Sequence, residues 1–159
     1  MREDVSLLDV ISSLFEGDEY FDALPVGVVN VELVTSESVR VMFSNRVDYN
    51  LLCRVSLEEG YSIDASWYTP RIVDKGHIIA RVGSRSDPGE DHNIFIYLFP
   101  ASGIMSTYMR AAAIGHKIID PKTNRIDMGR LLRYNLKVIK LVEKYRKIRY
   151  QNLIEKSRV

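Results

Sequence analysis

The sequence predicts an α+β protein, in which a mainly antiparallel sheet of five or six strands precedes two helices. Apolar residues alternate with polar ones through residues 25–102, and then recur at helical spacing through the basic residues 103–159. A short helix and an acidic connection are expected before the sheet, in residues 1–24. Because no internal repeat or long linker divides the chain, residues 1–159 are expected to form one domain with both C-terminal helices on one face of the sheet.

The expected N-terminal helix covers residues 5–15, where Asp4 or Ser6 can cap the start and Gly17 can end the helix. Its apolar side chains recur at helical spacing and are Leu7, Leu8, Ile11, Leu14 and Phe15. Residues 16–22, which follow, are rich in carboxylates. We therefore expect an amphipathic helix joined to the sheet by an acidic connection.

Short runs with strand character follow, separated by turn-forming residues. They are residues 29–33, 39–43, 51–57, 63–68, 71–73, 77–82 and 93–99. Because parallel strands need a dozen or more residues to cross over, these short connections favour antiparallel neighbours. Cys53 lies on the apolar side of the third run, a position typical of an inert core thiol.

Helical spacing returns in residues 104–119 and from residue 128 to about residue 155, where Asp127 can cap the start. The apolar stripe of the second helix comprises Leu131, Tyr134, Val138, Leu141, Val142, Tyr145 and Ile148. Its spacing also permits a coiled-coil seam, but one of under three heptads. Packing against the sheet is therefore the favoured interpretation.

The near-neutral total charge of +1 conceals a dipolar chain. Residues 1–102 contain 8 Lys and Arg against 17 Asp and Glu, a net charge of −9. Residues 103–159 contain 14 against 4, a net charge of +10, and the two parts sum to +1. Positive charge is therefore concentrated in the helical part.

The last helix is expected to carry a basic row opposite its apolar stripe. The row consists of Arg133, Lys137, Lys140, Lys144 and Lys147, and an irregular cationic tail begins at Arg149. Three interpretations are open: a solvated surface, a contact with nucleic-acid phosphates, or a contact with an acidic protein surface. The acidic surface could be Asp18, Glu19 and Asp22 of a neighbouring copy, which would make a head-to-tail homo-oligomer.

Residues 110–116 read Arg-Ala-Ala-Ala-Ile-Gly-His. Arg110 and His116 are spaced as in the Arg, four to six residues, His motif of HEPN-type ribonucleases, which this segment resembles over seven residues of 159. The resemblance implies a metal-independent ribonuclease with Arg110 and His116 as its catalytic residues.

The sequence also indicates which classes of protein and which kinds of site are not expected. It has no apolar stretch near the ~18 residues of a membrane helix, no basic-then-apolar signal peptide, and one cysteine, so we expect a soluble cytoplasmic protein. No glycine-rich phosphate loop, dinucleotide fingerprint or nucleophile motif is present, and we expect no cofactor and no metal site. Arg outnumbers Lys by 14 to 8 and Gln151 is the only glutamine, which suggests a thermophilic source.

The function favoured by the sequence is that of a non-catalytic binding or assembly subunit of a nucleoprotein or viral complex. The predicted contact residues are the basic row and Arg149. Two alternatives are a homo-oligomeric protein held by acidic-to-basic contacts and the small HEPN-like ribonuclease.

Overall fold

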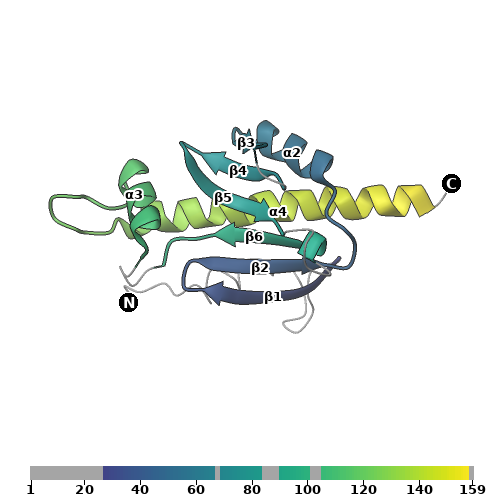
Figure 1. Ribbon diagram of the computed structural model, residues 1–159, viewed down its shortest axis with the longest axis horizontal. Helices are drawn as coiled ribbons and strands as arrows, with labels where there is room; N and C mark the ends of the chain where they lie inside the picture. The colour runs from purple at the N-terminus through teal and green to yellow at the C-terminus, as the bar shows by residue number, and fades with distance from the viewer. Residues whose placement is uncertain (1–26, 67–68, 84–89, 101–104, 158–159) are drawn as a thin grey trace.

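A computed structural model describes residues 27–66, 69–83, 90–100 and 105–157 of the chain. Within them, six antiparallel strands form one sheet that is covered by helices, which confirms the predicted α+β class (Figure 1). The helix expected in residues 5–15 lies outside the described residues. Along the described part of the chain, no helix is both long enough and apolar enough to cross a lipid bilayer.

The sheet combines a hairpin, a three-stranded meander and one inserted strand. Its strands are β1 (Val28–Thr35), β2 (Ser38–Phe43), β3 (Ser62–Asp64), β4 (Arg71–Asp74), β5 (His77–Val82) and β6 (Asn93–Tyr97). The spatial order is β1-β2-β6-β5-β4-β3, so the last strand of the sequence lies between β2 and β5 and joins the two halves. All five neighbouring pairs are antiparallel, as the short connections predicted.

The strand predicted for residues 51–57 is wrong, because this segment forms the helix α2 (Tyr49–Glu58). Its buried positions follow helical rather than alternating spacing, and they are Leu51, Leu52, Val55 and Ser56. Leu57, expected inside, has 58% of its surface exposed. The carboxylate of Asp48 accepts a hydrogen bond from the backbone N–H of Leu51 at 3.1 Å and so caps the helix. Cys53 is consequently a half-buried residue of a helix, and burial raises the pKa of its thiol.

The C-terminal part forms α3 (Thr107–Gly115) and the long helix α4 (Met128–Ser157). The first is shorter than the predicted span 104–119, because the chain leaves the helix at His116 and Ile119 pairs with Ile126 in an isolated β-bridge. Asp127 caps α4 as predicted, since its Oδ1 accepts a hydrogen bond from the backbone N–H of Arg130 at 3.1 Å. α4 extends past the strands at its C-terminal end (Figure 1).

The core lies between α4, α2 and one face of the sheet. Buried side chains of β2, β5 and β6 pack there against Val138, Ile139, Leu141, Val142 and Tyr145 of α4. A second cluster joins α3 to the start of α4 through Phe99, Met109, Ala113, Ile118 and Leu131. The apolar stripe of α4 is therefore used in the core, and core packing rather than a coiled-coil seam is the correct interpretation.

The opposite face of the sheet is partly polar. Arg40, Phe95 and Arg81 are cross-strand neighbours on β2, β6 and β5. The guanidinium carbons of Arg40 and Arg81 lie 5.1 and 4.1 Å from the centre of the Phe95 ring, which is only 4% exposed. Arginine thus covers the central aromatic ring on this face.

Candidate functional site

The orientation of α4 is fixed by two polar contacts inside the core. Asn135 is fully buried, and its side-chain amide makes two hydrogen bonds with the backbone of Phe99, at 2.9 and 3.0 Å. About three turns further on, the buried Tyr145 hydroxyl accepts a hydrogen bond from the backbone N–H of Asp48 at 2.9 Å. Because both contacts are directional, they set which side of α4 faces the sheet and which faces solvent.

The predicted basic row lies on the solvent side of α4. Arg133, Lys137, Lys140 and Lys147 are exposed, and Lys144 is half-buried. Because each residue of a helix adds 1.5 Å, the row from residue 133 to residue 147 extends over about 21 Å. The structure therefore brings all five predicted cations together on one straight element.

Lys144 is the member of the row that the protein's own acids neutralise. Its Nζ lies 2.6 Å from Glu59 Oε1 and 3.9 Å from Glu58 Oε2, at the end of α2. The hydrogen bond with Glu59 raises the pKa of Lys144. This contact ties α4 to the end of α2, so Lys144 is less available to an external anion than its neighbours.

The other four cations make no ion pair within 4 Å among the residues that the structure describes. Glu143, four residues before Lys147 on the same helix, binds Arg146 instead, at 3.0 Å. Lys137 has an aromatic neighbour, since its Nζ is 6.0 Å from the centre of the Tyr61 ring. We shall call Arg133, Lys137, Lys140 and Lys147 the free row.

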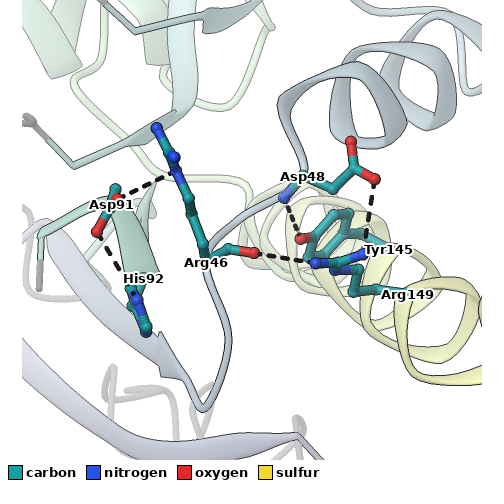
Figure 2. A network of polar contacts seen from close by, with 6 residues as sticks. All are labelled: Arg46, Asp48, Asp91, His92, Tyr145 and Arg149. Atoms are coloured by element: carbon teal, nitrogen blue, oxygen red, sulfur yellow. Dashed lines mark hydrogen bonds and ion pairs between the residues drawn. The ribbon is translucent and has the colours of Figure 1, made fainter. Parts of the chain in front are cut away.

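Arg149, the sixth predicted contact residue, points elsewhere (Figure 2). Its Nη1 lies 3.7 Å from Asp48 Oδ2, and its Nη2 donates a long hydrogen bond of 3.5 Å to the carbonyl of Arg46. In the same network Arg46 Nε lies 3.1 Å from Asp91 Oδ2. Arg149 therefore links α4 to the segment before α2 and does not belong to the free row.

The two residues of the HEPN-like motif, Arg110 and His116, lie on α3 and at its C-terminal cap. His116 caps the C-terminus of α3, and its ring centre lies 4.6 Å from that of Tyr134 and 6.2 Å from that of His77. Burial lowers the pKa of His116. Arg110 is half-buried on α3, and His116 Nε2 has no hydrogen-bond partner among the described residues. The ribonuclease interpretation stays a prediction.

The sequence analysis did not predict that the rings of His77, Tyr108, His116 and Tyr134 lie close together. His77 begins β5 and His116 ends α3, and the Tyr108 ring lies 5.4 Å from His77. No fixed spacing could have revealed it, because the contact depends on how α3 packs against the β4–β5 turn. Across the described ranges, no group of three or more His, Cys, Asp or Glu side chains is arranged to hold a metal ion.

In comparisons with known proteins, no protein family, curated protein or solved structure matches the chain.

Proposed function

We propose that the protein is a non-catalytic binding subunit that contacts the phosphate backbone of a nucleic acid through the free row on α4. The observation that carries the proposal is that four of the five predicted cations are exposed on one helix without an ion pair in the described residues. Each cation that neutralises a phosphate releases a condensed counterion, and this release is favourable at low salt.

The geometry suits the backbone of one strand. Cations three and four residues apart on a helix are about 5–6 Å from one another, so a strand that runs along α4 can meet several in succession. The row is also held rigidly, because the opposite side of the helix is buried in the core at Val138, Leu141 and Val142. A rigid row loses less conformational entropy on binding than the same cations on a mobile segment.

A charge-matched pair of variants tests the proposal. In the row variant, Arg133, Lys137, Lys140 and Lys147 are all replaced by Gln. In the control variant, four other exposed cations are replaced by Gln, namely Arg54, Lys122, Arg125 and Lys156. Both lose four positive charges, so a difference between them reports the position of the charge rather than its amount.

Binding of labelled 25-base-pair DNA and of single-stranded RNA is then measured by fluorescence anisotropy at low salt. The proposal predicts that the row variant loses most of its affinity for at least one of the two, while the control variant keeps most of it. Equal affinities for the two variants would contradict the proposal. Loss of self-association in the row variant, without any nucleic-acid binding by the native chain, would favour the homo-oligomer instead.

A further inference from the structure

Two arginines lie side by side on the face of the sheet opposite α4. Arg71 on β4 and Arg81 on β5 are direct cross-strand partners, and Phe95 on β6 is the next partner of Arg81. Like charges placed directly opposite each other on neighbouring antiparallel strands destabilise a sheet. An anion bound by both guanidinium groups would offset this repulsion, because each group matches the oxygens of an oxyanion.

Arg81 is held in place by neutral groups rather than by an acid. Its guanidinium carbon lies 4.1 Å from the centre of the Phe95 ring, and its Nε donates a hydrogen bond of 2.9 Å to the Tyr97 hydroxyl. It makes no ion pair within 4 Å in the described ranges, whereas Arg40 on the other side of the ring pairs with Glu32 at 2.6 Å. A guanidinium fixed in this way loses little conformational entropy when it binds an anion.

A small pocket lies next to these groups, between the sheet and the start of α3. Its volume is about 200 Å³, below the roughly 300–1,000 Å³ of pockets for drug-sized ligands, so it suits a small molecule. Arg71 and Tyr97 line it on the sheet side, and Tyr97 is the residue that binds Arg81. Ile78 and Tyr108, which is 48% exposed, add apolar surface. The pocket thus combines donors for an anion with an apolar wall.

Glu37, a carboxylate that also lines the pocket, is bound by the start of α3. Its Oε1 accepts a hydrogen bond from the backbone N–H of Ser106 and its Oε2 accepts one from the Ser106 hydroxyl, both at 3.1 Å. A carboxylate at the N-terminus of a helix is also stabilised by the helix dipole. Glu37 therefore obtains its donors from α3, and the charge of Arg81 is left for a ligand.

We propose that this pocket binds a small phosphate monoester, with Arg71 and Arg81 on the phosphate group. The Tyr97 hydroxyl accepts a hydrogen bond from Arg81 and so can donate its own proton to a phosphate oxygen. A phosphate monoester carries a charge of about −1.5 to −2 at pH 7, which matches two guanidinium groups better than a single carboxylate does. The organic group lies against Ile78 and Tyr108. This proposal is independent of the proposed function, because none of these residues belongs to the free row.

Titration of the full-length chain with phenyl phosphate tests the inference, with amide NMR shifts measured at about pH 7.5 and constant ionic strength. We expect saturable shifts at Ile78, Tyr97 and Ser106 in the native chain. Arg81→Gln is expected to weaken binding by roughly tenfold or more, the usual effect of losing a hydrogen bond to a charged group. Arg54→Gln, at an exposed position on α2, removes the same charge and should bind as the native chain does. No saturable shift in the native chain, or equal affinities for the native chain and Arg81→Gln, would overturn the proposal.

Two further comparisons separate the ligand chemistry from effects on folding. Tyr97→Phe keeps the ring and removes only the hydroxyl, so affinity is expected to fall by roughly three- to tenfold. If Arg81→Gln does not fold, native affinity in Tyr97→Phe would overturn the proposal. Benzoate has the same ring with one negative charge and should bind at least roughly tenfold more weakly than phenyl phosphate, and equal binding would overturn the assignment of a phosphate. The row variant should bind phenyl phosphate as the native chain does, so the failure of this proposal is distinguishable from that of the proposed function.

Discussion

The side-chain amide of Asn135 both accepts a hydrogen bond from the backbone N–H of Phe99 and donates one to the carbonyl of the same residue. This pair of contacts joins α4 to the chain just after β6, within a fully buried environment. A helix held only by apolar contacts could rotate or slide with little change in buried area. The two directional bonds select one orientation, and this orientation places the basic row in solvent.

Asn135→Ala is expected to lower the free energy of unfolding by roughly 2–4 kcal/mol, since it leaves both the N–H and the carbonyl of Phe99 buried without their partners. Urea unfolding followed by circular dichroism measures the change. Asn152→Ala, on the exposed part of the same helix, serves as the control and should change stability by less than about 0.5 kcal/mol. Equal effects at the two positions would show that Asn135 is not needed to hold α4.

Tyr145→Phe removes the hydroxyl that accepts a hydrogen bond from the backbone N–H of Asp48, and leaves the ring in the core. The expected loss of stability is about 1 kcal/mol, the usual net value of one such bond. Tyr150→Phe, at an exposed position of α4, should have almost no effect. The same urea experiment compares the two variants. A free energy of unfolding for Tyr145→Phe equal to that of the native protein would contradict the role assigned to this hydrogen bond.

Glu59→Gln is expected to strengthen nucleic-acid binding. The change removes the nearer of the two carboxylates at Lys144, 2.6 Å away, and leaves only Glu58 at 3.9 Å, so a fifth cation of the row becomes more available to phosphates. The slope of log K against log salt should then become steeper by up to about 0.9 with duplex DNA. Glu32→Gln on β1 gives the same change in net charge but removes a carboxylate that pairs with Arg40, not with a member of the row, and should leave the slope unaltered.

Stability should fall in mild acid because of His116. Burial lowers the pKa of this imidazole, and the nearby Lys75, His77 and Lys137 act in the same direction while Asp74 opposes them. Since the folded pKa lies below the unfolded value of about 6.5, the unfolded state binds more protons as the pH falls through that value, and stability is lost there.

The variant His116→Phe should therefore lose less stability than the native protein between about pH 7.5 and about pH 5.5. Unfolding free energies at the two pH values provide the comparison. Parallel pH dependences for the native protein and His116→Phe would contradict the role assigned to this residue.

Sequence patterns were sufficient for the elements whose side chains follow one clear period. The alternation of Val39, Val41 and Phe43 predicted β2, and the apolar stripe of α4 was correct except that it omitted Asn135 and Ile139. The stripe missed Asn135 because a polar residue in an apolar pattern is normally assigned to the surface. Only the backbone of Phe99, far away in the sequence, makes burial of this amide favourable.

In residues 51–57 the spacing of the apolar side chains alone was not enough to distinguish a strand from a helix. Leu51, Cys53, Val55 and Leu57 alternate as in a strand, yet Leu51, Leu52 and Val55 also fit a helix, and short apolar runs satisfy both patterns. The deciding signal was local, since Asp48 stands at the capping position three residues before Leu51. The strand order and the Lys144–Glu59 contact depend on how distant segments pack, which the pattern of one chain does not contain.

The most direct test of the free row is the salt dependence of binding to duplex DNA. Four phosphate contacts predict a slope of log K against log salt of about −3.6, which weakens binding by roughly 100-fold between about 50 and 200 mM salt. The row variant should show a slope near zero, while the control variant lacking Arg54, Lys122, Arg125 and Lys156 keeps the native slope. A native slope near zero, or the same slope for the native protein and the row variant, would contradict the account.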